Sequence, residues 1–530
     1  MQRQLRFILY FFIGIFTLAS LRLSYLALGN NSSEAAEIQS SYTLTVDTPR
    51  GTIYDRNMKH ISNGEESYRA VLTATPSVIS ELYKQLSKSR ADLLVEELRK
   101  GKPICTEVPS GFSATGCKTF LCYNKTPSYQ PAAQLVGYLD YSFQNGVCGL
   151  QSVFNSLLSC DHETKTVYAC GATGTALAGL EPNISIDMSQ YEKGVITTLD
   201  VELQNICEEA LKMVERGAVV ITRTGSGEIL AMASAPTFSL DKLDEALKNP
   251  DSPFVNRALS EYNLGSIFKI CVVAAAVENG ISTDFSYDCT GLVEVGNKFH
   301  CHKKEGHGVL NMTGAFSVSC NTYFINLAQK VGADKIFQTA KKLGLSSENV
   351  LCDGISGSSG GLGNLEEIRN VPAALANFSI GQGGVMVTPL QISQLVNTVA
   401  NGGVYFPPYL ISGIVDQNGE TKYEKVASGY RAISTQTADT LKNMMRLVMT
   451  EGTGVAGKPK TGDSGGKTAT AETGWTDPQG VAKKNAWFAG FYNTEAEGYS
   501  ISILVDGGTS GSSDAAPIFK CICDKISENQ

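Results

Sequence analysis

An uncharged apolar run opens the chain at residues 7–28, and only Arg22 interrupts it. A helix that spans a membrane needs about 20 such residues. We therefore predict a single transmembrane anchor here, with residues 1–6 in the cytoplasm because Arg3 and Arg6 precede the run. A cleaved signal peptide is the alternative. In either case the rest of the chain would work outside the cytoplasmic membrane.

After this run, the pattern of apolar positions changes twice. Residues 29–41 are polar, as in a linker next to a membrane, and residues 42–185 form short alternating runs that predict a β-rich module. From residue 186 onward, strand-like runs flank helical patterns. The stretch IFKICVVAAAVENG is apolar on every face and predicts a buried helix capped by Gly280. These patterns predict an α+β or an α/β sandwich, with a second domain over residues 186–530.

The composition is that of a large folded protein. The 530 residues are 42% apolar and 18% charged, which excludes a disordered chain. The formal net charge is −8. Because phosphate binding needs a basic surface, we expect no nucleic acid as a partner.

Fourteen cysteines are consistent with an extracytoplasmic location, where disulfides can form. Cys289, Cys301 and His307 lie close together in sequence with His302, and they are ligand types that zinc prefers. A structural zinc ion at Cys289, Cys301 and His307 is one interpretation. A disulfide between Cys289 and Cys301, or free thiols, are the others. Six further cysteines fall early, and their pairing cannot be deduced from sequence: Cys105, Cys117, Cys122, Cys148, Cys160 and Cys170.

Ser266 and Lys269 stand at the start of the apolar helix, one turn apart on the same face. Burial favours the neutral form of a lysine, and a neutral lysine can take the proton of a serine hydroxyl. This pair therefore predicts a serine nucleophile with a lysine base. Ser239 and Lys242 have the same spacing in a polar stretch, which indicates a surface position instead.

Two further triplets follow along the chain. Ser319 and Asn321 form a Ser-x-Asn triplet, which by itself is also typical of a helix N-terminus. Lys467 and Thr468 lie in GGKTATAETG just before a predicted strand, where a solvated turn is the simpler interpretation. Lys460 begins a competing Lys-Thr-Gly triplet in a loop without strand character.

The order S-x-x-K, S-x-N, K-T-x resembles the signature of penicillin-binding proteins and β-lactamases. Nearly the whole chain resembles the class B penicillin-binding proteins, which are membrane-anchored D,D-transpeptidases of peptidoglycan synthesis. The stretches that carry this resemblance are RGTIYDRN (50–57), TTLDVELQ (197–204), GEILAMAS (227–234), FVNRAL (254–259), SIGQG (379–383), TPLQIS (388–393), EGTG (451–454) and AWFAGF (486–491).

The resemblance implies an elongated N-terminal module over residues 42–185, which serves dimerisation or acts as a pedestal. It also implies a transpeptidase domain over residues 186–530, built on an antiparallel sheet flanked by helices. The implied partners are stem peptides ending in D-Ala-D-Ala, β-lactams, the cytoplasmic membrane and a polytopic SEDS-type glycosyltransferase. No cofactor is implied for the chemistry.

The resemblance also implies a role for each matching residue. Ser266 is the acylated nucleophile and Lys269 its base, while Ser319 and Asn321 move protons and hold the substrate amide. The implied binding groups are Lys467 and Thr468 for the terminal carboxylate, and the backbone N–H groups of Ser266 and Thr470 for the oxyanion.

One departure from the family pattern suggests a different function. Ala469 stands where the family has glycine, which lets the strand lie close to the ligand. A non-catalytic assembly protein for a cell-wall glycosyltransferase is therefore the alternative to a working enzyme. A β-lactamase or β-lactam sensor is a third hypothesis, although a β-lactamase would not need residues 42–185.

Overall fold

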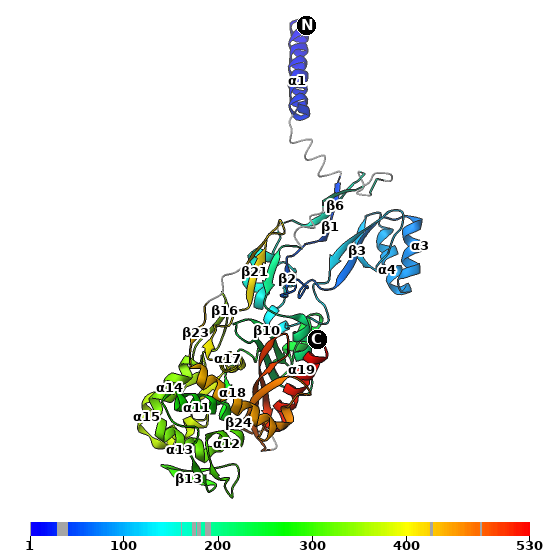
Figure 1. Cartoon of the computed structure of the whole chain (residues 1–530). Helices are drawn as coiled ribbons and strands as arrows, with labels where there is room; N and C mark the ends of the chain where they lie inside the picture. The colour runs from blue at the N-terminus through cyan, green and yellow to red at the C-terminus, as the bar shows by residue number, and fades with distance from the viewer. Residues whose placement is uncertain are drawn as a thin grey trace. The chain divides into compact units, whose positions relative to one another are not determined.

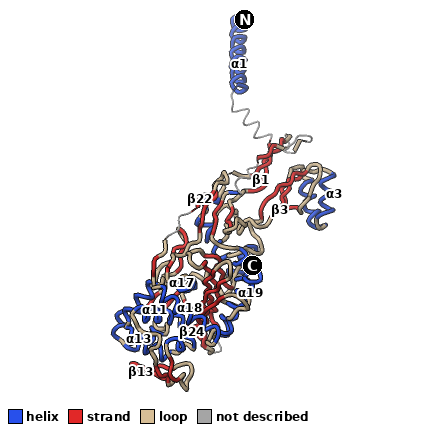
Figure 2. The backbone as a smooth tube through the Cα atoms, in the orientation of Figure 1, coloured by secondary structure: helices blue, strands red, loops and turns tan. Residues whose placement is uncertain are grey.

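We describe the chain from a computed structural model (Figures 1 and 2). The expected linker over 29–41 lies outside the described residues except for Ser41, and so does the expected domain boundary at 186. The structure describes residues 2–28, 41–160, 162–171, 176–177, 182–185, 192–423, 428–476 and 480–529.

The first element is helix α1 (Gln2–Leu28). Its segment Arg6–Tyr25 is long and apolar enough to cross a membrane. A signal sequence passes the same test, so both interpretations of the N-terminal run agree with this helix.

The chain folds into two compact units whose segments alternate along the sequence. The expected module at 42–185 differs from this division, because residues 51–64 and 125–159 belong to the second unit. The reason is a long-range pairing: β2 (Thr52–Tyr54) runs parallel to β8 (Gly194–Thr197). Unit 1 is Met1–Arg50, Glu65–Asn124 and Cys160–Gln190, and unit 2 is Gly51–Gly64, Lys125–Ser159 and Tyr191–Gln530.

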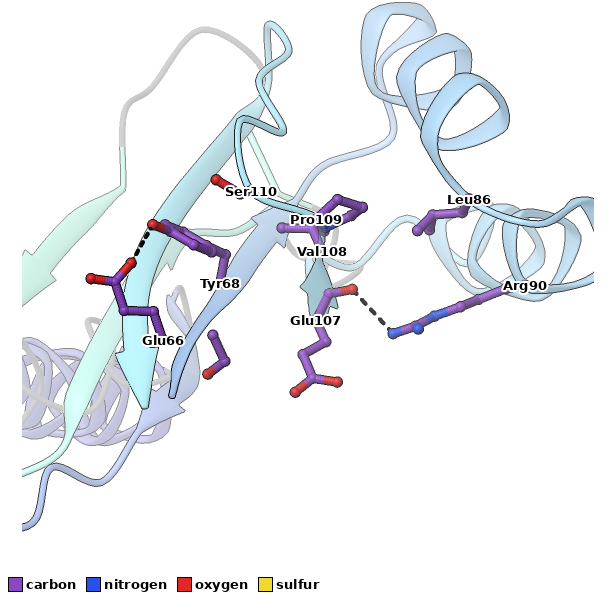
Figure 3. Close-up of a pocket in the computed structure, with 9 residues that line it drawn as sticks. Glu66, Tyr68, Leu86, Arg90, Glu107, Val108, Pro109 and Ser110 are labelled. Carbon is purple, nitrogen blue, oxygen red and sulfur yellow. Dashed lines mark hydrogen bonds between the residues drawn. The ribbon is translucent and has the colours of Figure 1, made fainter. Parts of the chain in front are cut away.

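Unit 1 contains two three-stranded antiparallel sheets, in the orders β1-β6-β7 and β4-β3-β5. Helices α3 and α4 pack on the second sheet through Val78, Leu82 and Val95. A hollow of about 370 Å³ opens beside them, where Arg90 donates to the Glu107 carbonyl at 3.1 Å (Figure 3). The elements are β1 (Ser41–Asp47), β3 (Glu66–Leu72), α3 (Pro76–Gln85), α4 (Lys88–Leu98), β4 (Ile104–Val108), β5 (Cys117–Tyr123), β6 (Thr164–Ala169) and β7 (Asn183–Ser185).

The core of unit 2 is a five-stranded antiparallel sheet in the order β10-β9-β26-β25-β24. Its inner strands β25 and β26 are buried on both faces along most of their length, as expected of a sheet covered by helices on each side. The expected antiparallel sheet flanked by helices is therefore present. The strands are β9 (Gly217–Arg223), β10 (Ile229–Ala235), β24 (Asp463–Thr476), β25 (Ala482–Asn493) and β26 (Gly498–Gly508).

Hydrophobic clusters cover both faces of this sheet, and the two largest join it to helices. One joins it to α9 (Val201–Leu211) and α19 (Ala516–Glu528). The other joins it to α11 (Lys269–Glu278), α17 (Pro389–Ala400) and α18 (Thr435–Thr450). Figure 1 shows α18 beside β24, at the edge of the sheet.

Helix α11 is the buried helix that the sequence predicts. Its residues from Lys269 to Ala276 are all buried. It ends where expected, because Gly280 has φ +76 and its N–H bonds back to the Val277 carbonyl.

Shorter elements complete unit 2. Their bounds are α5 (Ala133–Val136), α6 (Gly149–Val153), α7 (Asn155–Leu158), η1 (Leu240–Lys242), α10 (Leu243–Leu247), β11 (Tyr262–Asn263), η2 (Gly265–Phe268), β12 (Tyr287–Cys289), β13 (Leu292–Val295), β14 (Asn297–His300), β15 (Gly308–Leu310), α12 (Met312–Ser317), α13 (Asn321–Val331), α14 (Ala333–Lys342), β16 (Asn349–Cys352), β17 (Ile355–Gly357), β18 (Gly361–Leu362), α15 (Leu365–Asn370), α16 (Pro372–Ser379), β19 (Val385–Val387), β20 (Val404–Tyr405), β21 (Ile411–Val415), β22 (Thr421–Tyr423), β23 (Tyr430–Arg431), η3 (Val455–Gly457) and η4 (Gly511–Ala515).

Candidate active site

Ser266 lies in the single turn η2 that leads into α11, and Lys269 is the first residue of that helix. Gly265, just before the serine, has φ +71. A Cβ added there would lie 3.0 Å from the Thr470 carbonyl, so the glycine lets this turn lie directly against β24. Ser266 itself remains partly exposed and can meet a ligand.

The Lys269 ammonium links the Ser-x-x-Lys motif to the Ser-x-Asn triplet. It is fully buried and donates to the Ser319 carbonyl at 2.8 Å and to Asn321 Oδ1 at 2.8 Å. It also contacts Ser319 Oγ at 3.2 Å and lies 5.3 Å from the ring centre of Phe324. Burial lowers the pKa of Lys269 to about 7, so a large share of this amine is neutral near pH 7.

The third triplet lies in β24, and its Lys467 contacts the second triplet. Its Nζ is also fully buried and lies 2.9 Å from Ser319 Oγ, so both lysines share one hydroxyl. Burial, and after it the charge of Lys269, lower the pKa of Lys467. Two ammonium groups this close repel each other, which favours one neutral amine in the pair.

The threonines beside Lys467 are held by neighbouring loops. Thr468 Oγ1 lies 2.6 Å from Thr453 Oγ1, in the EGTG stretch. Thr470 is exposed, and its Oγ1 accepts from the Gly511 N–H at 3.2 Å. Two neighbouring loops therefore hold this part of β24.

Ala469 does not project into open space. Its side chain is 3% exposed and belongs to the hydrophobic cluster on the α11 side of the sheet. Gly511 packs on its backbone, since a Cβ added to Gly511 would lie 2.5 Å from the Ala469 carbonyl.

The competing triplets lie elsewhere. Lys460 is exposed and pairs with Glu528 of α19 at 3.2 Å. Lys242, in the other Ser-x-x-Lys, is exposed and lies in η1, so the surface interpretation of that pair agrees with the structure.

The cysteine and histidine group has a fourth member that the sequence reasoning missed. Cys289, Cys301 and His307 converge as expected, and Cys320 joins them, with the four ligand atoms within 4.8 Å of one another. His302 is exposed and is not part of this group. The only signal for Cys320 in the sequence is its thiol, because it lies well separated from the other three ligands and inside the Ser-x-Asn triplet. Cys289, Cys301 and Cys320 are free thiols in the structure, so the disulfide between Cys289 and Cys301 is not formed.

Comparison with known proteins decides the family. Residues 217–524 match the penicillin binding protein transpeptidase domain. The chain belongs to this family. The resemblance to class B penicillin-binding proteins is thereby confirmed, and the matched region contains all three triplets of this penicillin-binding chain.

Individual relatives extend the match beyond that domain. Penicillin-binding protein PbpB of Mycolicibacterium smegmatis is 30% identical over 423 residues, which cover 74% of this chain and 63% of that protein. Stage V sporulation protein D of Bacillus subtilis is 26% identical over 512 residues, which cover 89% of this chain and 76% of that protein. This chain thus spans less than two thirds of the first of these penicillin-binding relatives.

A solved structure shares the fold. Penicillin binding protein 3 from Mycobacterium tuberculosis, complexed with aztreonam, aligns with a TM-score of 0.66 over 92% of this chain and 97% of that one. Only 23% of residues are identical, so this likeness concerns the architecture. It agrees with the α+β fold expected of a penicillin-binding protein.

Proposed function

We propose that this chain is a serine-type D,D-transpeptidase that cross-links peptidoglycan stem peptides and is acylated by β-lactams. The observation that carries the proposal is the hydrogen-bond network of Lys269, Ser319, Asn321 and Lys467, next to the partly exposed Ser266. It brings residues of three sequence-distant triplets together beside β24.

In the acylation step, Ser266 Oγ attacks the carbonyl between the two terminal D-alanines while neutral Lys269 accepts its proton. The Oγ–C bond forms and the C–N bond breaks. The leaving amine of D-alanine receives a proton through the Ser319 hydroxyl, which contacts both lysines. Backbone N–H groups of Ser266 and Thr470 stabilise the oxyanion, a contribution typically worth about 3–4 kcal/mol.

The remaining residues bind the substrate. Lys467 and Thr468 hold the terminal carboxylate, and the Asn321 side chain holds the substrate amide. An amine from a neighbouring stem peptide then attacks the Ser266 ester, so that a new C–N bond forms and the serine is released. A β-lactam would form the same ester and stay bound, because its leaving amine remains tethered.

A labelling experiment tests this function. The ectodomain is incubated with a fluorescent penicillin, and the Ser266→Ala variant is compared with Ser239→Ala, which removes the serine of the competing Ser-x-x-Lys. We expect labelling in the unmodified chain and in Ser239→Ala, and none in Ser266→Ala. Equal labelling of all three would exclude Ser266 as the nucleophile, and mass spectrometry of the digest locates the adduct.

The non-catalytic alternative rested on Ala469. Its methyl group is buried in a hydrophobic cluster and does not project into open space at the site. This favours a working enzyme over an assembly protein without activity.

We also propose that α1 anchors the protein as a single-pass membrane helix, with the N-terminus in the cytoplasm and the catalytic unit outside. Residues 42–185 would then present a docking surface for a polytopic SEDS-type glycosyltransferase. Fusing residues 1–28 to alkaline phosphatase, which is active only outside the cytoplasm, tests the orientation. An inactive, intact fusion would contradict it.

The proposed chemistry needs no cofactor. Separately, we propose that Cys289, Cys301 and His307 hold a structural zinc ion. These side chains offer two thiolates and an imidazole, ligands typical of structural zinc sites. Metal analysis of protein purified without a chelator, with Cys301→Ser as the comparison, tests this. Absence of stoichiometric metal from the unmodified protein would end the idea.

A further inference from the structure

The cysteine and histidine cluster consists of Cys289, Cys301, His307 and Cys320, and these residues come from four separate points of the chain. Cys289 ends β12, and His307 precedes β15, which pairs with it. Cys301 follows β14, and Cys320 immediately precedes α13. The three cysteines are between 0% and 3% exposed.

Three distances between the ligand atoms agree with a tetrahedral zinc site, and all of the atoms lie within 4.8 Å of one another. Zinc binds sulfur at about 2.3 Å and nitrogen at about 2.0–2.1 Å, so the edges of the tetrahedron are about 3.8 Å between sulfurs and about 3.5 Å between sulfur and nitrogen. His307 Nδ1 lies 3.5 Å from Cys289 Sγ and 3.5 Å from Cys301 Sγ. Cys301 Sγ lies 3.9 Å from Cys320 Sγ, whereas a disulfide requires about 2.05 Å.

Four protein ligands complete the coordination. Structural zinc sites are closed in this way, whereas catalytic zinc keeps one position for water or substrate. Cys320 therefore supplies the fourth protein ligand that a structural zinc site needs.

Cys320 is also the central residue of the Ser-x-Asn triplet. Its neighbours Ser319 and Asn321 supply all three oxygen atoms that Lys269 contacts. Asn321 Nδ2 additionally lies 3.5 Å from the carbonyl of His300, beside the ligand Cys301.

The backbone at Ser319 needs external support. Its φ of +55 lies in the left-handed region, which a serine adopts at a cost of about 1–2 kcal/mol. Such conformations persist where the surroundings fix them. A metal bond to the next side chain would do so.

We propose that a zinc ion bound by Cys289, Cys301, His307 and Cys320 positions Ser319 and Asn321 against Lys269, so that acylation of Ser266 depends on the metal. Cys320 is then a positioning residue. The inference rests on the proposed transpeptidase function and on the zinc site, and it adds a link between the two.

The test uses the full ectodomain, purified without a chelator, and measures zinc content, thermal midpoint and the kinetics of acylation by a fluorescent penicillin. Cys320→Ser removes the ligand inside the triplet. Cys289→Ser removes a ligand on β12, outside the triplet, so under the proposal its effect reaches Ser319 through the ion. Cys207→Ser is the matched control, since Cys207 is fully buried in α9 and outside the cluster.

We expect one zinc per chain in the unmodified protein and in Cys207→Ser. Both ligand variants should lose zinc, and the rate constant of the acylation step should fall at least tenfold, with less change in the initial binding of penicillin. Chelated unmodified protein should show the same loss and recover when zinc is added. A merely structural ion would not produce this split between binding and acylation.

Several results would overturn the proposal. One is unmodified protein without stoichiometric metal, and another is an unchanged acylation rate in metal-free Cys289→Ser. If metal-free protein simply unfolds, by circular dichroism, the ion serves folding and the positioning role is also rejected. Failure of the proposed transpeptidase function would give a different result. In that case the unmodified protein would contain zinc and still not be acylated by the fluorescent penicillin.

Discussion

At the scale of single residues, the site depends on how two buried lysines share one hydroxyl. Ser319 Oγ lies 2.9 Å from Lys467 Nζ and 3.2 Å from Lys269 Nζ. Burial lowers the pKa of both amines. A hydroxyl can donate to a neutral amine and accept from a charged one, so Ser319 can relay a proton between them without moving.

The lowered pKa of Lys269 predicts how acylation depends on pH. Only the neutral amine can accept the serine proton, so the rate of penicillin acylation should rise as pH increases through about 7 and level off above it. Stopped-flow labelling between pH 5.5 and 8.5 measures this.

A pair of arginine substitutions supplies the control for the pH experiment. Lys269→Arg cannot provide a neutral base and should lower the rate by about 10²–10⁴-fold. Lys460→Arg, on the exposed pair with Glu528, should leave rate and pH profile unchanged. A flat profile in the unmodified protein would contradict the role of Lys269.

The second prediction at this scale concerns Ala469→Gly, which restores the family's usual residue. Because the methyl group is buried in the core, its removal should lower the free energy of unfolding by about 0.5–1 kcal/mol. The acylation rate should stay within about twofold. Denaturant unfolding and penicillin labelling check both, and a large gain in acylation would show that the methyl obstructs the ligand.

At the scale of elements, the site forms where short turns pack against the strand β24. The turn η2 lies against β24 through Gly265, and η4 lies against it through Gly511. A Cβ on Gly511 would meet the carbonyls of Trp487 at 2.3 Å and Ala469 at 2.5 Å. These glycines set how closely the pieces of the active site approach.

Gly511→Ala should therefore push η4 away from β24. We expect a loss of about 1–3 kcal/mol in stability and slower acylation, because the Gly511 N–H holds Thr470 Oγ1. Gly314→Ala in α12 is the matched control, since its added Cβ would stay 3.4 Å from its nearest neighbour. That control should keep or slightly raise the thermal midpoint, whereas equal effects of the two changes would contradict the packing argument.

Local patterns predicted the elements that depend on local physics. Helix α11 was predicted from its continuous apolar character, and its end was predicted from Gly280. Both signals depend on residues only a few positions apart in the chain. The Ser-x-x-Lys spacing placed Ser266 and Lys269 one turn apart for the same reason. Lys460 was expected in a loop without strand character, and β24 begins only at Asp463; it includes Lys467, which was expected just before a strand.

Features that depend on long-range contacts were not predicted. No spacing rule connects Cys320 with Cys289, because β12, β15 and α13 bring them together only in the folded chain. The same holds for β2, whose partner β8 lies far along the sequence. The expected domain division therefore followed sequence order, whereas the two units alternate.

At the scale of the whole molecule, one segment of unit 1 begins and ends at the same place, because its two ends are paired with each other. Residues 65–124 enter and leave unit 1 side by side, since Asn124 N donates to the Glu65 carbonyl at 2.9 Å and Glu66 pairs with Tyr123. This segment also has its own hydrophobic cluster with α3 and α4. It is built as an insertion.

Replacing residues 65–124 by a short Gly-Ser bridge should leave the acylation rate of the folded ectodomain within about twofold, because every proposed catalytic residue belongs to unit 2. Removing residues 51–64 instead deletes β2 from the sheet with β8 and should lower the thermal midpoint sharply. Penicillin labelling and thermal unfolding compare the two deletions. A folded 65–124 deletion without labelling would contradict the prediction.

The pairing of β2 with β8 also sets an order of events during biosynthesis. Tyr54 accepts a hydrogen bond from Thr197, 143 residues later, and Ser412 of β21 bonds to Ile196 across a further 216 residues. At about 5–20 residues per second, the ribosome needs tens of seconds to deliver both partners. During that interval the residues of β2 lack the partner strand that completes their sheet, so this part of unit 2 can form only after the later strands have been made.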